Sequence, residues 1–526
     1  MSDELNWIVT RAQKGQMSRR EFIGRTTALG VSVALAGALY TKSAYAEPKK
    51  GGTIRVGIVG ATSTSSLDPA LASGVGQMVS NASWGEQLVE MTADGTVDMR
   101  IAEEVSSSPD LKVWTFKIRK GVEFSNGKAV TAEDVAATIK RHTDKNSKSG
   151  ALGIVKGISE VKAEGDKLEL TLQAPSADFP YLLTDYHLII QPGGGYDDPT
   201  AAIGAGPYVL KTFDPGVRYV LQKNPNYFDN RIGHAETIEI LVINDNAART
   251  AALRSGQVHM INRVDPKVAK LLTGAPGVSI RRAEGRGHYV FVMHCDKAPF
   301  DNKDLRMALK YAIKRQEMVD KILGGFGSIG NDFPINKAYP LFDNTIEQRE
   351  FDAAKAKEHY EKSGHDGSPI ILKTSNSSFP GAIDACNLFA ASCKEIGIPL
   401  KVQLVPDDSA VSVWNVEPFC TTYWNGRPTQ DQQYSTTCLS TAEWNDTRFK
   451  NAKFDELLFA ARAEVDQGKR KSMYSEMAHI LREEGGLILP MFNDYVAGVR
   501  DEIAGWVDDP NAELMNFRAP VKCWLA

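Results

Sequence analysis

The sequence lacks the motifs by which most hydrolases are recognised. It contains no Gly-x-Ser-x-Gly element, no His-Glu-x-x-His helix and no phosphate-cradling Gly-Lys-Ser/Thr loop. Nor does it carry a Ser-x-x-Lys in the context of a penicillin-binding enzyme. We therefore expect that the protein is not an enzyme. Missing motifs do not exclude one, so an exported hydrolase stays the alternative from a different functional class.

Histidine and cysteine are scarce, with nine and six residues among 526. His288 and His294 form a close histidine pair on a predicted strand. Residues six apart on one strand share a face, so a metal role is an alternative to two ordinary strand histidines. No cysteine spacing resembles a zinc site. We expect neither a metal nor a cofactor.

All six cysteines lie beyond residue 46, and an oxidising compartment would allow some of them to pair. Cys386 and Cys393 fall in a predicted helix, where a rise of about 1.5 Å per residue puts their Cα atoms about 10.5 Å apart. A disulfide tolerates roughly 7 Å, so we expect these two not to be bonded to each other. Cys420 and Cys438 bracket a loop of interest and are the candidate pair.

The sequence also lacks a large excess of one charge. Beyond residue 46 it has no hydrophobic run long enough to span a membrane. The chain has 61 basic and 65 acidic residues, a formal net charge of −4. This balance argues against a nucleic-acid or anionic-membrane partner. The length allows a large core and suggests two or three domains.

The N-terminal 46 residues have the three regions of an export signal. A twin-arginine pair, Arg19 and Arg20, precedes an uncharged run at 26–40 and an Ala-Tyr-Ala sequence at 44–46. A membrane-spanning helix needs about 20 apolar residues, more than this run supplies. We therefore expect a twin-arginine signal peptide at 1–46, cleaved after export, and a location in the periplasm.

Strands and helices alternate along the remaining chain, which predicts an α/β protein. Apolar alternation predicts strands at 52–59, 112–118, 158–164, 167–172, 208–212, 219–222 and 238–243. Helical spacing predicts helices at 131–142, 245–255, 303–322 and 379–396, and two within 454–484 separated near Gly468.

One long motif then suggests a family. It is Trp-Thr-Phe-Lys-Ile-Arg-Lys-Gly-Val-Glu-Phe-Ser-Asn-Gly at 114–127, followed by Thr-Ala-Glu-Asp-Val at 131–135. Three landmarks follow it: Gly-Ala-Gly-Pro-Tyr at 204–208, Asn-Pro-Asn-Tyr-Phe at 224–228, and Pro-Phe-Asp-Asn at 299–302 with Leu305, Arg306 and Ala308. This ordered set resembles the family 5 extracellular solute-binding proteins, the peptide, nickel and opine receptors of ABC importers.

The resemblance implies a fold and its domains. It implies two α/β lobes that close on a ligand about a hinge, a periplasmic binding-protein fold of type II, cluster C-like, with a subdomain inserted in the first lobe. The main part of the first lobe would comprise 47–79, 204–295 and 497–526. The inserted subdomain would be 80–203 and the second lobe 296–496. The expected partners are a small-molecule ligand and the membrane subunits of an ABC permease, and we expect a monomer.

The ligand depends on one loop, Tyr423-Trp424-Asn425-Gly426-Arg427-Pro428. Peptide receptors of this family carry an Asp shortly after a Trp in this loop, and that Asp neutralises the α-ammonium group of the ligand. Here Arg427 stands at or beside that position. A guanidinium disfavours a buried ammonium and favours a carboxylate or phosphate. We expect Arg427 to fix an acidic group and Trp424 to cover an apolar or sugar face, with Tyr423 and Asn425 beside them.

Alternatives remain open for this loop. Asp431 restores the peptide interpretation if the loop shifts by four residues. Arg427 as a solvated loop residue and Trp424 as a core aromatic are the plain interpretations. An opine-like sugar–amino acid conjugate is the leading ligand, a short peptide is the second, and nickel or haem is a distant third.

Other residues complete the expected site. Ser63 and Thr64 lie in a hydroxyl-rich loop after the first strand, at the edge where α/β proteins tend to bind ligands. Asn376 and Ser377 precede a predicted helix, whose N-terminus suits an anion. Two aromatic residues are also expected near the ligand. Trp84 lies where the resemblance places a residue near the cleft, and Tyr289 begins the strand that leads to the hinge.

Overall fold

The computed structural model describes residues 19–28, 48–144, 146–375, 378–406, 414 and 416–526 of the chain. Most of the expected signal peptide therefore lies outside the described residues, which include only helix α2 (Arg19–Ala28) from it. Asn376 and Ser377 also lie outside them. Within the described part, no helix is both long and apolar enough to cross a membrane.

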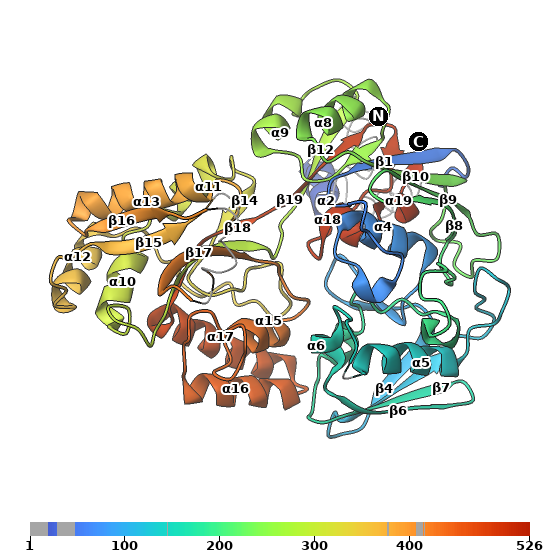
Figure 1. Ribbon diagram of the computed structural model, residues 1–526, viewed down its shortest axis with the longest axis horizontal. Coiled ribbons are helices and arrows are strands. Elements are labelled where there is room, and N and C mark those ends of the chain that lie inside the picture. The colour runs from blue at the N-terminus through green and yellow to red at the C-terminus, as the bar shows by residue number, and fades with distance from the viewer. Residues whose placement is uncertain (1–18, 29–47, 145, 376–377, 407–413, 415) are drawn as a thin grey trace.

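A seven-stranded mixed sheet forms the centre of the first lobe (Figure 1). Its order is β12 (Val278–Ala283), β19 (Tyr495–Arg500), β11 (Met260–Ile261), β1 (Thr53–Ile58), β10 (Thr237–Val242), β9 (Arg218–Lys223) and β8 (Tyr208–Asp214). β1 pairs in parallel with β10 and β11, and the other ladders are antiparallel. β1 buries Ile54, Val56 and Ile58 in a core shared with α4 (Val75–Trp84). Helices α8 (Asn246–Ser255) and α9 (Pro266–Leu272) complete this layer.

A six-stranded sheet forms the second lobe. Its order is β14 (Gly327–Ile329), β18 (Leu487–Asn493), β13 (His288–Met293), β17 (Phe419–Trp424), β15 (Ile370–Thr374) and β16 (Leu400–Leu404). Its helices are α10 (Lys303–Tyr311), α11 (Arg315–Lys321), α12 (Ala353–Lys362), α13 (Ala382–Ile396), α15 (Gln430–Thr437), α16 (Ala452–Ala463) and α17 (Gln467–Glu484). β13 pairs with β17 and β18 in this sheet, although we expected residues 204–295 in the first lobe.

A separate four-stranded antiparallel sheet lies within the region expected as the inserted subdomain. Its order is β4 (Ala102–Ser107), β5 (Val113–Ile118), β7 (Lys167–Leu172) and β6 (Ile158–Glu164). Helix α5 (Ala132–Thr143) packs on this sheet, and the helix and the sheet form one hydrophobic core that is separate from that of the seven-stranded sheet. The Thr131 hydroxyl accepts from the Asp134 N–H at 3.2 Å, while the Asp134 carboxylate accepts from the Thr131 N–H at 3.0 Å. This capping box starts the helix where the sequence predicts it.

The remaining short elements connect these layers. They are β2 (Val89–Met91), β3 (Val97–Met99), α6 (Leu152–Val155), α7 (Phe179–Leu182), α18 (Glu513–Asn516), α19 (Ala519–Lys522), β20 (Ile503–Ala504), β21 (Trp524–Leu525) and the 3-10 turns at Pro69–Leu71 and Pro192–Gly195.

The helix predicted at 303–322 is wrong as a single element. α10 ends at Tyr311, and α11 begins only at Arg315. The carbonyl of Ala312 accepts from the Ser392 hydroxyl of α13 at 2.7 Å, and Lys314 has non-helical backbone angles. Arg315 turns its guanidinium to the buried Asp332 carboxylate at 2.7 Å. Tertiary contacts therefore break a helix that the apolar spacing alone would continue.

The cysteine pairing predicted between Cys420 and Cys438 is also wrong, because all six cysteines are free. Cys420 lies on β17 in a core formed with Val290 and Val292, whereas Cys438 ends α15 in a different core cluster. Cys386 and Cys393 lie on one helix, α13, as predicted, and do not bridge.

The chain crosses between the two large sheets through short links. Residues 284–287 join β12 to β13, and Asp494 joins β18 to β19. Asp494 forms an ion pair with Arg282 of the first sheet. Its N–H donates to the carbonyl of Phe326 in the second lobe at 3.2 Å. Asp494 therefore contacts both lobes at the crossing.

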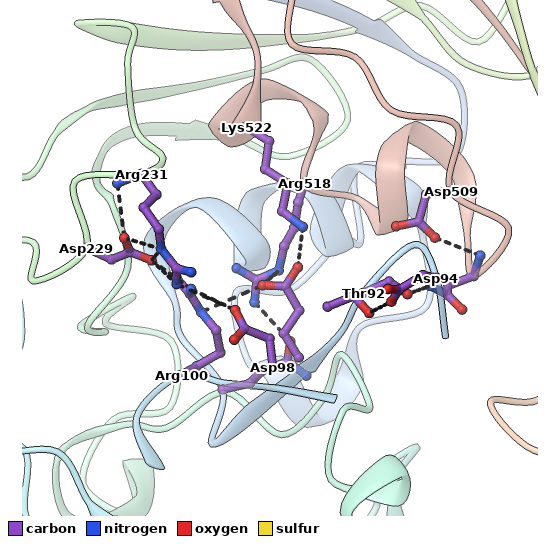
Figure 2. Close-up of polar contacts among 12 residues, drawn as sticks. Thr92, Asp94, Asp98, Arg100, Asp229, Arg231, Asp509, Arg518 and Lys522 are labelled. Atoms are coloured by element: carbon purple, nitrogen blue, oxygen red, sulfur yellow. Dashed lines mark hydrogen bonds and ion pairs between the residues drawn. The ribbon is translucent and has the colours of Figure 1, made fainter. Parts of the chain in front are cut away.

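A buried ion network fastens the C-terminal segment to the first lobe (Figure 2). Arg100 lies 3.0 Å from Glu86 and 2.8 Å from Asp229, and Arg518 lies 3.0 Å from Glu86. Burial alone would raise the pKa of Glu86, but Arg100 and Arg518 lower it to about 2. Figure 2 shows Arg518 and Lys522 extending from the C-terminal segment into this network.

Candidate functional site

A cavity of about 1250 Å³ lies between the lobes. One wall comes from residues between 73 and 189, the opposite wall from residues between 425 and 444, and the C-terminal segment 511–518 adds to the lining. Small-molecule sites are commonly about 300–1,000 Å³ in volume, so this cavity has room for a ligand of several linked groups.

The loop after β17 forms part of the second-lobe wall. Asn425, Gly426, Arg427 and Pro428 all line the cavity. A Cβ atom at Gly426 would lie 2.1 Å from Cβ of Arg286, so only glycine lets this loop touch the 284–287 link. The Arg427 N–H donates to the Tyr339 hydroxyl at 3.2 Å. The position of Arg427 is therefore tied to the crossing between the lobes.

The Arg427 guanidinium has no carboxylate within 4 Å among the described residues. Its side chain donates to the carbonyl of Asn425 at 3.2 Å and, more weakly, to that of Gly426 at 3.5 Å. Burial lowers the pKa of Arg427, and Tyr339 and Asp185 oppose that shift. A guanidinium keeps its charge at neutral pH, so this wall presents a cation to a ligand.

Arg286 places a second guanidinium at the cavity. It is buried, and its Nε and Nη2 donate to the carbonyl of Ala338 at 3.0 and 2.8 Å. Its Cζ lies 5.0 Å from the centre of the Tyr339 ring, a cation–π contact. Within the described chain no carboxylate pairs with it. We did not predict Arg286; its one sequence signal is that it stands between two glycines.

Most carboxylates of the cavity already have partners. Asp431 lies 3.0 Å from Arg462, Glu513 2.7 Å from Arg263, and Asp185 2.6 Å from His187. Burial raises the pKa of Asp431, and Arg462 opposes the shift. Arg462 already pairs with the Asp431 carboxylate, which disfavours the alternative in which Asp431 binds the ammonium group of a ligand.

Trp424 lies outside the wall of this cavity. It is only 8% exposed, and its Nε1 donates to Oδ2 of Asp446 at 2.9 Å. This placement matches the plain interpretation of Trp424 as a core aromatic. Tyr423 is 52% exposed and also does not line the cavity.

The other expected contacts are dispersed. Ser63 and Thr64 are exposed on the loop after β1, outside the cavity lining. Trp84 is fully buried in the core of the first lobe. Tyr289 stacks on Phe379, with ring centres 4.4 Å apart. The structure therefore brings Arg427 and Asn425 to the cavity and places these four residues elsewhere.

Further cavity residues have no signal in the sequence because distant segments bring them together. They include Arg263, Glu513 and Phe517 from the first-lobe side and Trp444 from the second. His288 and His294 do not form a metal site. His288 donates from Nδ1 to the carbonyl of Arg286 at 3.0 Å, and burial lowers its pKa to about 4. Among the described residues, no group of three or more His, Cys, Asp or Glu side chains is placed to hold a metal ion.

Comparison with known proteins gives a consistent family. Residues 96–446 match the model for bacterial extracellular solute-binding proteins, family 5 Middle. The probable D,D-dipeptide-binding periplasmic protein of Escherichia coli (strain K12) is 24% identical over 489 residues, covering 85% of this chain and 90% of that protein. The dipeptide-binding protein of Pseudomonas aeruginosa PAO1 is 25% identical over 471 residues, covering 80% of this chain and 86% of that protein.

Solved structures show the same fold. The binding protein AgaA of A. tumefaciens R10 in complex with agropinic acid has a TM-score of 0.75 at 22% identity, covering 90% of this chain and 99% of that one. An ABC transporter-associated periplasmic binding protein of Helicobacter pylori in complex with the peptide STSA has a TM-score of 0.74 at 21% identity, covering 91% and 98%. The predicted two-lobed α/β fold is confirmed.

Proposed function

Because the chain belongs to family 5 of the bacterial extracellular solute-binding proteins, we propose that it is the periplasmic receptor of an ABC importer and captures a small acidic solute. The ligand would bridge the two walls of the cavity. Its contacts with both lobes would exist only in the closed state, so binding would shift the protein towards closure.

One observation carries the acidic ligand: the cavity holds guanidinium groups without carboxylate partners. Six cationic side chains line it, Lys156, Arg263, Arg286, Arg427, Arg462 and Arg518, against four carboxylates, Asp185, Asp431, Glu443 and Glu513. Three of those carboxylates are already paired with protein side chains. Arg286 and Arg427 therefore leave positive charge for a ligand anion, which a guanidinium binds through charge-assisted hydrogen bonds.

Within the acidic class, an opine-like sugar–amino acid conjugate is the leading ligand. Relatives named for dipeptides and a structural neighbour that holds agropinic acid are both similar to this chain. They leave short peptides as the second candidate. A peptide ammonium would need a free carboxylate, but Asp431 is occupied by Arg462, and Glu443, which has no ion pair among the described residues, is exposed at the cavity wall. An acidic conjugate avoids that conflict.

Native mass spectrometry of the protein as purified tests the proposal. We expect a bound small molecule that carries net negative charge in solution and is recovered with unchanged mass after prolonged incubation with the protein. Binding without turnover is part of the proposal. A neutral or cationic ligand would contradict the acid-binding role, and steady conversion of the ligand would favour the exported hydrolase.

We also propose that the protein reaches the periplasm by the twin-arginine route and acts there as a monomer. Replacing both Arg19 and Arg20 with Lys should leave the uncleaved precursor in the cytoplasm, since the route depends on this pair. Cell fractionation with an immunoblot measures this. Normal export of the double variant would contradict the route without touching the binding proposal.

A further inference from the structure

A tightly bonded turn holds a tryptophan at the wall of the cavity. Asn445 is at the centre of this turn: its Nδ2 donates to the carbonyls of Leu439 at 3.3 Å and Phe449 at 2.7 Å. Its Oδ1 accepts from the Thr447 hydroxyl at 3.1 Å, and the N–H of Asp446 donates to the carbonyl of Trp444 at 2.9 Å. The backbone that carries Trp444 is therefore fixed before any ligand arrives.

The indole of Trp444 is backed by two further indoles. Its ring centre lies 5.9 Å from that of Trp424 and 6.3 Å from that of Trp414. Those two rings are held in turn, because both donate from Nε1 to the same Oδ2 of the buried Asp446, at 2.9 and 3.1 Å. Such support fixes the ring and lowers the entropy that a ligand contact would cost.

Trp444 alone of the three lines the large cavity. It is 46% exposed, whereas Trp424 is 8% exposed. A ring with no ligand role would gain free energy by burying that face, at roughly 25 cal/mol per Å² of apolar surface. The Trp444 ring instead stays partly exposed to a cavity that Arg427 also lines, although Trp424 and Trp414 support it.

We propose that Trp444 is a stacking platform for the flat, C–H-rich face of the ligand, a sugar ring or an aromatic ring, at a distance from its acidic group. The role that we predicted for Trp424 thus belongs to its neighbour in space. This inference rests on the proposed receptor function and adds one statement about the ligand, which must carry a ring as well as a negative charge.

Calorimetric titration with matched acids tests the platform. N-benzoylglutamate and N-acetylglutamate carry the same two carboxylates and differ in the ring, and agropinic acid supplies the sugar-derived ring. Trp444→Ala should lower the affinity for whichever ring-bearing probe binds, by about ten-fold. This size is in keeping with aromatic pair energies of roughly 0.5–1.5 kcal/mol beyond burial. It should leave N-acetylglutamate within about two-fold. Trp444→Phe should retain most of the affinity.

Tyr196→Ala is the matched control, because Tyr196 is 60% exposed and does not line the cavity. It should change no affinity. Equal affinities of wild type and Trp444→Ala for every ring-bearing probe would overturn the platform. An equal loss for all three acids would overturn it too, since it would indicate a general effect on the cavity.

Iodide quenching of tryptophan fluorescence keeps the test valid if Trp444→Ala does not fold. Trp444→Phe should remove the iodide-accessible component, and a bound ring should protect that component in the wild type. No protection by any ring-bearing probe would overturn the platform. If neutral phenyl β-glucoside binds and protects Trp444 while the acids do not bind, the platform stands and the acidic ligand fails.

Discussion

At the scale of single residues, two guanidiniums reach the cavity for different reasons. Arg427 lies on a loop that directly follows a predicted strand, so comparison of that loop with the family motif could identify it. Arg286 lies in a link between sheets, where neither periodicity nor spacing marks a function. Its role becomes visible only when Gly426 closes on it and its hydrogen bonds are found to end on the carbonyl of Ala338.

A pH-dependent stability is predicted for Asp446. Burial raises its pKa to about 6, against the hydrogen bonds from Trp414 and Trp424. The native state thus holds this proton more tightly than the unfolded chain does between about pH 4 and pH 6, so unfolding free energy falls as pH rises through that window. At pH 7.5, where Asp446 is ionised, the free energy of unfolding is then lower by an amount on the order of 2 to 3 kcal/mol than it is with Asp446 protonated.

Asp446→Asn removes this titration. The unfolding free energy of the variant minus that of wild type is the quantity of interest. This difference should be larger at pH 7.5 than at pH 4 by an amount on the order of 2 kcal/mol. Urea unfolding of both proteins at both pH values measures it, and the difference between proteins cancels every other titrating group. An equal difference at the two pH values would contradict the assignment.

At the scale of elements, local signals set several boundaries. Thr131→Ala should destabilise the inserted sheet and helix α5 by about 1 kcal/mol, because it leaves the Asp134 N–H without its cap. Chemical denaturation measures the loss. Thr143→Ala, in the last turn of the same helix, is the control and should cost less. A smaller effect at Thr131 than at Thr143 would contradict the capping argument.

The contact between the 425–428 loop and the 284–287 link gives a second prediction. Gly426→Ala places a Cβ 2.1 Å from that of Arg286 and should cost about 1–3 kcal/mol of stability, because neither backbone can easily move away. It should also displace Arg427 and weaken ligand binding. Gly153→Ala, on α6 with open space around it, should be neutral or slightly stabilising. Thermal unfolding separates the two variants.

Elements with a short-range cause were predictable, and those with a long-range cause were not. β6 and β7 have the predicted bounds because a tight turn joins them and β7 alternates strictly between buried and more exposed side chains. The break between α10 and α11 depends on Ser392 and Asp332, which lie far along the chain. The boundary between α16 and α17 falls at Asp466, two residues before Gly468, because Asp466 caps α17.

At the scale of the whole molecule, the buried ion network joins the C-terminus to the first lobe. Arg518→Met should destabilise the protein by about 3–5 kcal/mol, since Glu86 and Glu90 would remain buried with one cation fewer. Arg218→Met is the control: its pair with Glu239 is half exposed and should contribute less than about 1 kcal/mol. Similar urea midpoints for the two variants would contradict the network's role.

The cavity as a whole could not be predicted from the sequence. The two-lobed fold could, because ordered motifs along the chain carry it. The lining, however, combines residues near 80, 180, 286, 427 and 517, and no periodicity joins such distant positions. Trp424 illustrates the limit, since the motif pointed to a loop of which residues 425–428 line the cavity, while tertiary packing presents Trp444 to the cavity in place of Trp424.

The central claim is that Arg427 binds the acidic group of the ligand. Calorimetric titration of wild type and Arg427→Ala with the ligand released from the purified protein tests it most directly. The claim predicts that affinity falls by roughly ten- to a hundred-fold, the worth of a hydrogen bond to a charged group, while the unfolding midpoint changes little. Unchanged affinity in a folded Arg427→Ala variant would contradict it.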